Sequence, residues 1–415
     1  MQADIFHKIP NTGRLAAGIA MLATITDPEQ PYTRRPFTEL FQRGRQWLRV
    51  EMEAAGLDVT LDAAGNLVGR QAGREDLPPL MIGSHSDTVA GGGRFDGVIG
   101  VVGGLEIVRC LRELEVSLRH PLEVVDFLAE EPTDFGVSTV GSRGMVGALS
   151  PALLAKTNEL GQPLSDALSA LGGRPEQVAS QVRQRGDIAA YLEMHIEQGP
   201  VLDQEGIPLA SVTGIAGIRR FTVIVDGQPN HAGTTPMELR RDALVAASRF
   251  VIESESVFRS EENSVGTIGH LQISPNMANV VPGRAELIVE MRSIDPQIID
   301  RIDQRLHQKA AEIAKEREIS IWMEPLTDAA PVQADPRLIE ITTQACRQAD
   351  PRALVLPSGA GHDAIQIGTI APIGMIFVPS RNGISHNPAE WTDGEDIALG
   401  VQAMARALVL ADEAF

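Results

Sequence analysis

The pattern of apolar and polar positions divides the first half of the chain into alternating helices and strands. Residues 37–56 repeat apolar side chains at helical spacing and end on Gly56, a typical residue for the position after a helix. Residues 57–73 predict two short strands about an Ala-Gly-Asn turn. An apolar strand over 78–89, a helix over 97–115 and a buried strand over 120–131 follow. This order predicts an α/β domain with a largely parallel sheet.

The middle of the chain has a different pattern. From about residue 214 to 329 the expected order is β-α-β-β-α-β, which is typical of a self-contained two-layer α+β unit. The α/β theme then resumes with a helix over 336–349, a strand over 371–379 and a terminal helix. The sequence therefore predicts one α/β domain in two parts, residues 1–213 and 330–415, with a smaller domain inserted over 214–329.

Composition narrows the classes of protein. The chain has 415 residues, of which 43% are hydrophobic, and a formal net charge of -19. This charge argues against nucleic acid or an anionic membrane as partner, but not against a small anionic substrate. Only two cysteines occur, Cys110 and Cys346, and the first 30 residues resemble an amphipathic helix more than a signal peptide. No apolar run could span a bilayer, so a cytoplasmic protein is expected.

The nine histidines fall into two groups by their surroundings. Four have settings typical of structural or exposed histidines: His7, His120, His270 and His307. The other five lie in polar, glycine-rich junctions where a strand should end: His85, His195, His231, His362 and His386. Since ligands of open α/β sheets bind at the carboxyl ends of strands, the second group predicts a functional site.

Carboxylates accompany these histidines. Asp87 follows His85 by two residues and could fix the tautomer that binds metal. Asp96 precedes the helix expected from residue 97 and could bridge two ions, although a helix N-cap is an alternative role. Glu130 and Glu131 stand side by side where a buried strand ends before a proline. Cations would remove the repulsion between these two carboxylates, so the pattern predicts a metal site.

Eight motifs occur in this order: GSHSDTV, GGGRFDGVIGV, LAEEP, EMHIEQGPVL, NHAGTTPM, MANVVPG, SGAGHDA and ISHNPAE. Together they closely resemble the hydantoinase/carbamoylase family amidases, which include N-carbamoyl-L-amino acid hydrolases, β-ureidopropionases and allantoate amidohydrolases within the aminoacylase and carboxypeptidase metallopeptidase superfamily. The resemblance extends from the region of His85 to Glu390. It implies the architecture predicted above, with the insert serving as a lid and dimerisation domain, and therefore a homodimer.

The resemblance also implies two divalent metal ions per subunit. The implied ligands are Asp96 as the bridge, His85 and His195 on one ion, and Glu131 and His386 on the other. Glu130 would be the general base and Asp87 would orient His85. Histidine and carboxylate ligands suit zinc, manganese, cobalt or nickel, and a pair of ions can activate water and polarise a carbonyl.

Further residues are implied to contact the substrate. His231 of the insert would stabilise the oxyanion or the substrate, often in the site of the partner subunit. Arg292 and Asn279 would bind the substrate carboxylate, and Arg292 is favoured because a guanidinium can form a bidentate pair. An outward-facing strand-end arginine is the alternative. Two more positions would line the pocket: Gln198 and the loop from Gly359 to His362, in which His362 either contacts substrate or only packs.

One short stretch departs from the family pattern. Many relatives have Glu-Glu-Gly-Ser-Arg-Phe where this chain has EEPTDF, so Pro132 stiffens the turn and Asp134 replaces an arginine. The metal site should survive this change because both glutamates are present. The departure bears on the substrate subclass within the family, which the motifs leave open.

The leading prediction is a metal-dependent amidohydrolase that removes the carbamoyl group of N-carbamoyl-L-amino acids and releases ammonia and carbon dioxide. Allantoate amidohydrolase and β-ureidopropionase are alternatives that the motifs do not separate. A peptidase or aminoacylase is less favoured, because the wider superfamily more often has an acidic ligand where His195 stands. An inactive small-molecule-binding homologue is the non-enzyme alternative, and the presence of all ligands and the base argues against it.

Overall fold

The computed structural model describes Phe6 and residues 9–415, which form two compact units. The first comprises the described residues up to Thr213 together with Gln333–Phe415, and the second comprises Gly214–Val332. The insert expected over 214–329 falls within the second unit. His7 and the first residues of the expected N-terminal helix lie outside the described part of the chain.

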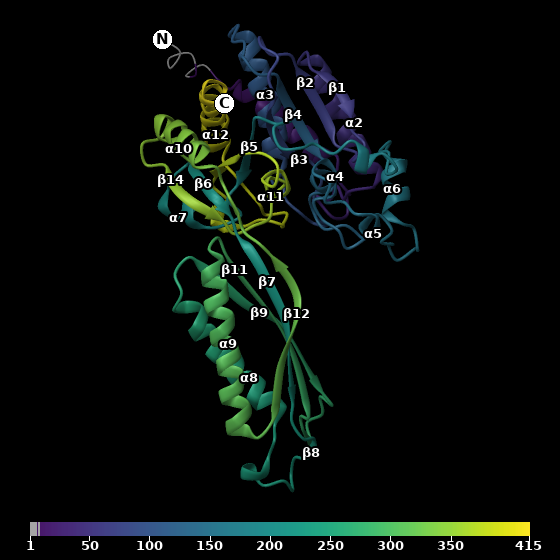
Figure 1. Ribbon diagram of the computed structural model, residues 1–415, viewed down its shortest axis with the longest axis vertical. Helices are drawn as coiled ribbons and strands as arrows, with labels where there is room; N and C mark the ends of the chain where they lie inside the picture. Colours follow the sequence, from purple (N-terminus) through teal and green to yellow (C-terminus); the bar gives the residue numbers. More distant parts are fainter. Residues whose placement is uncertain (1–5, 7–8) are drawn as a thin grey trace. The chain divides into compact units, whose positions relative to one another are not determined.

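A nine-stranded mixed sheet forms the centre of the first unit (Figure 1). Its order is β1-β2-β4-β3-β5-β15-β6-β13, with β14 also paired to β6. The central pairs β4–β3, β3–β5 and β5–β15 are parallel. The strands are β1 (Asp58–Leu61), β2 (Leu67–Gln71), β3 (Leu80–His85), β4 (Leu122–Phe127), β5 (Ala190–Ile196), β6 (Ala210–Ile215), β13 (Val332–Gln333), β14 (Leu354–Ser358) and β15 (Ile373–Val378).

Helices pack on this sheet because the central strands β3, β4, β5 and β15 are buried along their whole length and must be covered on both faces. Helices α3, α10 and α12 contact β3, β5 and β15, while α4 contacts β4 and α11 contacts β5 and β15. The helices of this unit are α1 (Thr12–Thr24), α2 (Glu39–Ala54), α3 (Val98–Glu113), α4 (Val140–Met145), α5 (Pro151–Leu154), α6 (Leu164–Ala170), α7 (Val201–Glu205), α10 (Pro336–Ala349), α11 (Ala364–Ile367) and α12 (Gly394–Ala414).

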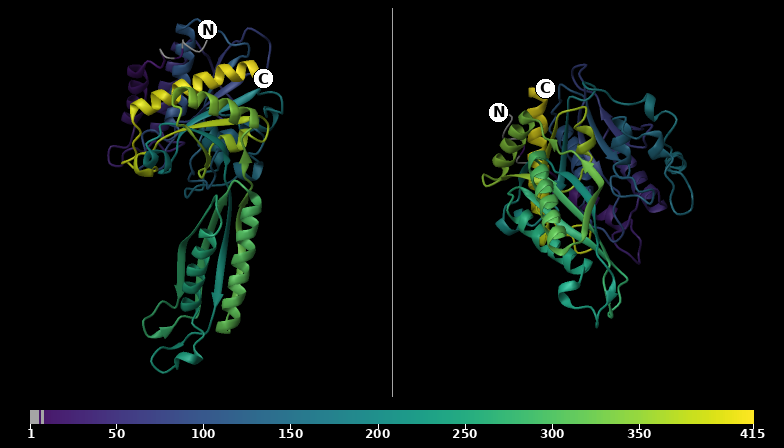
Figure 2. Two further views of the ribbon diagram at one scale, coloured as in Figure 1. Left: turned by 90° about the vertical axis from the view of Figure 1, so that its left-hand side faces the viewer. Right: turned by 60° about the horizontal axis from the view of Figure 1, so that its bottom comes forward.

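The second unit is a four-stranded antiparallel sheet with two helices on one face (Figure 2). Its strand order is β12-β7-β11-β9, and a separate two-stranded ribbon pairs β8 with β10. Buried and partly exposed residues alternate along β11, as expected of a strand with one covered face. The elements are β7 (Gly217–Asp226), β8 (Asn230–His231), α8 (Ala243–Arg259), β9 (Ser264–Ser274), β10 (Val280–Val281), β11 (Arg284–Ser293), α9 (Pro296–Arg317) and β12 (Ser320–Ala329).

The predicted fold class is confirmed: the protein is a mixed α/β protein with a mostly parallel central sheet. The expected helices over 37–56 and 97–115 correspond to α2 and α3, and the expected strand over 120–131 corresponds to the shorter β4. The short helices α4 to α6 carry no strong periodicity and were not predicted. Among the described helices, none combines the length and apolar character that crossing a membrane requires. Cys110 and Cys346 are buried free thiols on α3 and α10.

Candidate metal centre

Four neighbouring parallel strands bring the predicted ligands to one edge of the sheet. His85 is the last residue of β3, and His195 is the next-to-last residue of β5. Glu131 follows the end of β4 by four residues, and His386 lies in the loop after β15. Because parallel strands end at the same edge, residues far apart in the sequence meet here.

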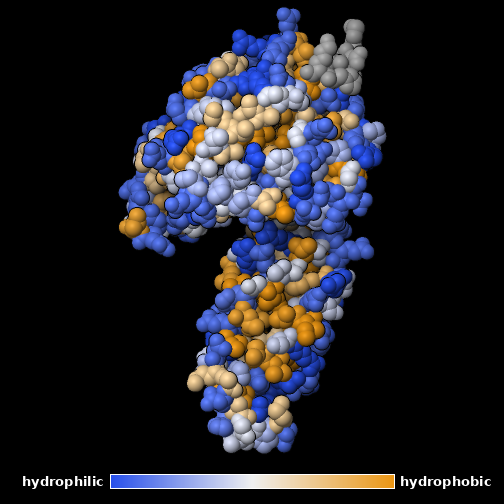
Figure 3. All heavy atoms as spheres, turned by 180° about the vertical axis from the view of Figure 1, so that it is seen from behind, coloured by the Kyte–Doolittle hydropathy of each residue, from blue (hydrophilic) through white to orange (hydrophobic). Residues whose placement is uncertain are grey.

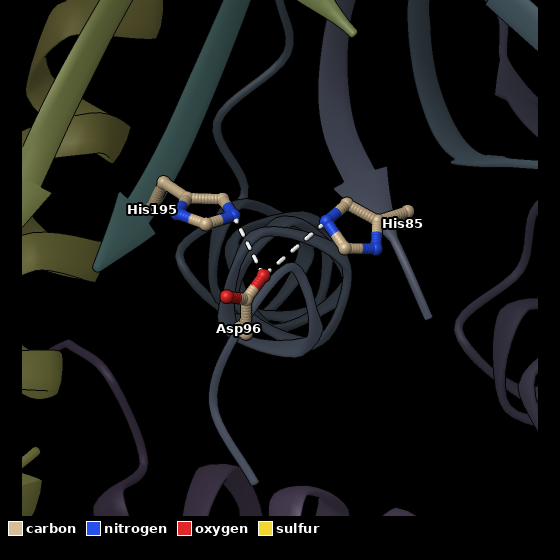
Figure 4. A group of neighbouring side chains, drawn as sticks. All are labelled: His85, Asp96 and His195. Atoms are coloured by element: carbon tan, nitrogen blue, oxygen red, sulfur yellow. Dashed lines mark ion pairs between the residues drawn. The ribbon is translucent and has the colours of Figure 1, made fainter. Parts of the chain in front are cut away.

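Asp96 lies between His85 and His195 (Figure 4). Its Oδ1 is 3.5 Å from His85 Nε2 and 3.4 Å from His195 Nε2. All three side chains are buried, and their ligand atoms lie close enough together to hold one ion. These three residues form what we call the inner cluster.

The other oxygen of Asp96 faces a second group of ligands. Asp96 Oδ2 is 3.3 Å from His386 Nε2, which is 3.2 Å from Glu131 Oε1. These three residues, the outer cluster, could hold a second ion, and Asp96 is common to both clusters. Glu130 lies beside them, with its Oε2 3.8 Å from His85 Nε2.

The two clusters fit divalent ions by geometry and by donor type. Ligand atoms at about 2.0–2.1 Å from a tetrahedral ion lie about 3.3–3.4 Å from one another. The four distances from Asp96 and His386 to their neighbours range from 3.2 to 3.5 Å. Imidazole nitrogen and carboxylate oxygen are also the donors that zinc, manganese, cobalt and nickel accept.

Burial makes the ionised carboxylates costly at this edge. Burial raises the pKa of Glu130 well above its usual range, and the charges of Glu131 and Asp363 add to the shift. Burial and the nearby Asp96 raise the pKa of Glu131 to about 7. Burial opposes a charged His85, but Asp87, Glu130 and Asp96 together raise its pKa. Divalent cations would take the place of these protons and stabilise the carboxylate form.

Asp87 connects His85 to both glutamates. Its carboxylate accepts hydrogen bonds from the backbone N–H groups of Glu130 (3.2 Å) and Glu131 (3.1 Å). His85 Nδ1 lies 3.1 Å from the Asp87 carbonyl oxygen and 3.6 Å from its Oδ1. Asp87 therefore fixes the loop that carries the glutamates as well as the ring of His85, which is more than the sequence indicated.

Asp96 is not a helix N-cap. The cap of α3 is Gly97, and Asp96 Oδ2 instead accepts hydrogen bonds from Gln198 Nε2 (2.6 Å) and Ser385 Oγ (2.8 Å). Gly97 has φ 65°, and a Cβ there would overlap the ring of His85. Glycine is thus required where the ligand loop turns into α3.

Other non-glycine residues with positive φ also gather at this edge. Ala129 (φ 53°) precedes Glu130, and Gln198 (φ 57°) and His386 (φ 53°) carry predicted site side chains. Such conformations are uncommon outside glycine and persist only where surrounding contacts hold them. Three of the ten such residues in the described part of the chain lie at this edge, where they carry or adjoin predicted site side chains.

Two residues predicted to line the pocket differ in exposure. Gly359 is exposed, whereas His362 is buried, with its ring 4.5 Å from that of His195 and its Nε2 2.8 Å from Ser358 Oγ. This arrangement favours the packing role over the substrate contact for His362. Gln198, by contrast, donates from Nε2 to Asp96 Oδ2 at 2.6 Å, and the same Nε2 is 3.3 Å from His386 Nε2.

The predicted substrate residues of the insert lie at opposite ends of the second unit. His231 on β8 and the exposed Asn279 are neighbours, because Ala232 donates its N–H to the Asn279 carbonyl oxygen at 3.0 Å. Arg292 is near the far end of β11, where its Nε donates to Glu290 Oε1 at 2.7 Å. Arg284, at the start of β11, is eight residues (292 − 284) from Arg292, which corresponds to about 27 Å along a strand.

Of the four histidines expected to be structural or exposed, the structure describes three, His120, His270 and His307. His120 is buried, and its Nδ1 is 2.7 Å from the Pro78 carbonyl oxygen. His270 and His307 are exposed on the second unit. Asp134, the departure from the family pattern, is an exposed residue that pairs with Arg35 at 2.7 Å and leaves the two clusters intact.

Several buried acids near the clusters were not predicted. Glu193 stands two residues before His195 on β5, so both side chains point to the same face, and Ser84 donates its hydroxyl to Glu193 at 2.7 Å. Asp363 accepts a hydrogen bond from Ser142 at 2.6 Å. The sequence did contain a signal for Glu193: it is an acidic residue in a mostly apolar strand, two residues before the predicted ligand His195. Glu390 is the last residue of the motif ISHNPAE, but no role was predicted for it; its contacts are described below.

Known proteins match this chain over most of its length. Residues 81–409 match the model of peptidase family M20/M25/M40. An N-carbamoyl-L-amino acid amidohydrolase of Geobacillus stearothermophilus is 40% identical, covering 91% of this chain and 92% of the relative. An allantoate amidohydrolase of Escherichia coli K12 is 36% identical (91% and 92%), and a ureidoglycolate hydrolase of Oryza sativa is 34% identical (93% and 82%). The crystal structure of a hydantoinase/carbamoylase family amidase from Burkholderia multivorans superposes with a TM-score of 0.90 at 33% identity, covering 97% and 98% of the two chains.

Proposed function

Because the chain belongs to peptidase family M20/M25/M40, we propose that it is a metal-dependent amidohydrolase that cleaves the carbamoyl C–N bond of N-carbamoyl-L-amino acids. The resemblance to hydantoinase/carbamoylase amidases is confirmed, and the chain is a hydrolase acting on non-peptide C–N bonds. The products would be the amino acid, carbon dioxide and ammonia. One observation carries the proposal: the buried Asp96 presents one oxygen to each of two ligand clusters.

We assign the inner and outer clusters to two divalent ions, whose identity among zinc, manganese, cobalt and nickel is open. Held there, the ions would supply Lewis-acid activation of the ureido carbonyl and of a water molecule. Glu130 takes the proton of that water and delivers it to the leaving nitrogen, as a general base and then acid. Its position beside His85, outside the short ligand contacts, supports this role.

The substrate preference is supported by similarity in sequence. The carbamoyl amino acid amidohydrolase is somewhat more similar to this chain than the allantoate and ureidoglycolate enzymes, which makes the latter two the second candidates. Ammonia release should be measured with N-carbamoyl-L-amino acids, their D-enantiomers, N-carbamoyl-β-alanine, allantoate and ureidoglycolate. We expect the highest kcat/KM on an N-carbamoyl-L-amino acid. If kcat/KM is at least tenfold higher for allantoate or ureidoglycolate, the protein has that activity instead. The cytoplasmic location stays a prediction.

We also propose a homodimer in which each site uses residues of both copies. Arg292 and the His231–Asn279 pair are separated by the length of β11, about 27 Å, so one small substrate cannot contact both within a single second unit. If both act on the same molecule, they come from different subunits.

The surface of the second unit is suited to such an interface. Apolar side chains gather on it (Figure 3), and α8 and β9 expose four large ones: Val245, Ile252, Val265 and Leu271. Exposed apolar groups of this kind mark protein–protein interfaces, and β9 is an edge strand of its sheet. Light scattering coupled to gel filtration tests the dimer directly.

A complementation experiment tests the shared site. Glu130→Ala and His231→Ala subunits, each inactive alone, are mixed under conditions that exchange subunits. If His231 acts in the partner's site, each mixed dimer contains one intact site, and an equal mixture recovers about a quarter of the wild-type activity. If His231 acts within its own chain, no mixed dimer has an intact site and activity stays at the level of the parents.

A further inference from the structure

We propose that Glu390 is a positioning residue that holds the bridging carboxylate of Asp96 in place. The inference rests on the proposed function, since it concerns the affinity of the site for metal. Glu390 is separated from Asp96 by 294 positions in the sequence. It is not one of the ligands assigned above, and its effect would pass through Asp96.

Glu390 contacts both the backbone and the side chain of the Asp96 loop. Its Oε1 accepts hydrogen bonds from the N–H groups of Phe95 at 2.8 Å and Asp96 at 3.1 Å. Its Oε2 is 2.8 Å from Ser385 Oγ, which is also 2.8 Å from Asp96 Oδ2. One carboxylate thus fixes the main chain at Asp96 and, through Ser385, the oxygen that faces the outer cluster.

The position of Glu390 also links two of the three loops that supply the outer cluster. Ser385 and His386 precede Glu390 in the loop after β15, while Asp96 belongs to the loop between β3 and α3. The following residue, Trp391, packs edge-on against Phe95 with ring centroids 5.6 Å apart. A change at Glu390 would therefore alter the distance between Asp96 and His386.

Burial explains why this carboxylate has a defined role. Glu390 is only 1% exposed, and a carboxylate removed from water is costly unless donors surround it. The N–H groups of Phe95 and Asp96 provide two donors, and the single hydroxyl proton of Ser385 is shared between Glu390 and Asp96. Partners of this kind behind metal ligands typically change metal affinity about 10–100-fold when they are removed.

Gly93 offers an independent way to perturb the same contact. A Cβ built on Gly93 would overlap the carboxylate of Glu390, and no other atom is among its nearest neighbours. Its φ is not in the left-handed region, so alanine is compatible with the backbone. Gly93→Ala should therefore displace Glu390 without removing any group that touches the two clusters.

The experiment measures binding of Co²⁺ to the full-length, metal-stripped protein by visible absorption, with metal content checked by mass spectrometry. For Glu390→Ala we expect about 10–100-fold weaker binding. Glu390→Gln should stay within about tenfold of the wild type, because its amide oxygen can accept both N–H groups. The matched control is Glu395→Gln, which removes an exposed carboxylate five residues later and should bind as the wild type does.

Gly93→Ala should weaken binding in the same direction. The double variant Gly93→Ala/Glu390→Ala should be no weaker than the worse single variant within about threefold, because both changes remove one interaction. The melting temperature of each metal-free variant separates a general loss of stability from a loss of affinity. A purely structural Glu390 would lower the melting temperature and leave the affinity of the folded protein unchanged.

The outcomes separate the inference from the function on which it rests. Absence of Co²⁺ binding by the wild type would refute the metal site itself. Wild-type affinity in Glu390→Ala, or losses that multiply in the double variant, would overturn only the role of Glu390. If Glu390→Ala fails to fold, Gly93→Ala decides: undiminished affinity in that variant overturns the proposal.

Discussion

The proposed roles of Glu130 as general base and of Asp96 as a ligand of both ions give the sharpest prediction. Glu130→Ala should keep both ions and lose turnover, whereas Asp96→Ala should lose the ions. Among the four ligand-to-ligand distances of 3.2–3.5 Å, three involve Asp96 and none involves Glu130. Removing Asp96 therefore breaks both clusters at once, while removing Glu130 leaves all four distances in place.

The size of the effect follows from the role. Loss of a general base typically costs about 10²–10⁴-fold in rate, or about 2.7–5.4 kcal/mol in the activation barrier. We expect kcat of Glu130→Ala to fall within this range at unchanged metal content. Glu130 is mostly buried beside His85, so solvent cannot easily supply a substitute base.

The assay combines metal analysis with ammonia release on the same preparation. Each variant is stripped, reloaded and desalted before measurement, and Glu205→Ala, at an exposed glutamate of α7, serves as control. The assignment is refuted if Glu130→Ala loses metal but keeps its turnover per remaining site, since that result would exchange the roles of the two adjacent glutamates. Two bound ions in Asp96→Ala would refute the bridging role.

Three further predictions concern single side chains. Arg292→Lys should raise KM for the carboxylate substrate by about tenfold or more with a smaller change in kcat, because a lysine cannot form the bidentate pair; an unchanged KM would exclude Arg292 as the carboxylate contact. Burial raises the pKa of both Cys110 and Cys346 to about 12, so a thiol reagent at pH 8 should modify neither in the native protein and both after unfolding; rapid labelling of the native protein would contradict this. Burial, with Asp393, Glu395 and Asp203 nearby, raises the pKa of Asp396 to about 6, above its unfolded value of about 3.9. Its stabilising contribution is complete below pH 4 and is lost as the pH rises through 6. Asp396→Asn should therefore increase the free energy of unfolding at pH 8 by up to about 1 kcal/mol, after discounting for partial exposure, and change it little at pH 4; chemical denaturation at both pH values measures the difference, and an equal effect at both would refute it.

The fold and the ligand clusters were accessible from the sequence because their signals are local. Apolar strands such as 120–131 end in polar junctions, and a parallel sheet brings those junctions together whatever their separation in the chain. That rule predicts that His85, Glu131, His195 and His386 meet at one edge, but it groups them with His231, which lies in the second unit, and with His362. The selection of the ligands among these residues came from the resemblance to the family. The adjacent glutamates were likewise explained once the strand was seen to end before them, at Phe127.

The hydrogen bonds that hold the ligand loops could not be predicted from the sequence, because they involve backbone N–H groups that every residue except proline has. Asp87 was expected to hold His85, yet its carboxylate binds the N–H groups of both glutamates. The separation of Asn279 from Arg292 was in principle derivable, since Arg292 is the ninth residue of the ten-residue strand β11, which begins after Asn279. Strand length, rather than motif identity, decides which residues can meet on one substrate.

The two clusters differ in their access to solvent, and this difference suggests how the site works. His85 and His195 are almost completely buried at strand ends, whereas the side chain of His386 is 46% exposed on a loop. The inner cluster is thus fixed by the sheet, and the outer cluster depends on the loop that contains Ser385, His386 and Glu390. In the role proposed for Glu390, its contacts with the Asp96 loop keep that loop at a fixed distance from the exposed loop of His386. The carboxylate of Asp96 can then face both the inner and the outer cluster.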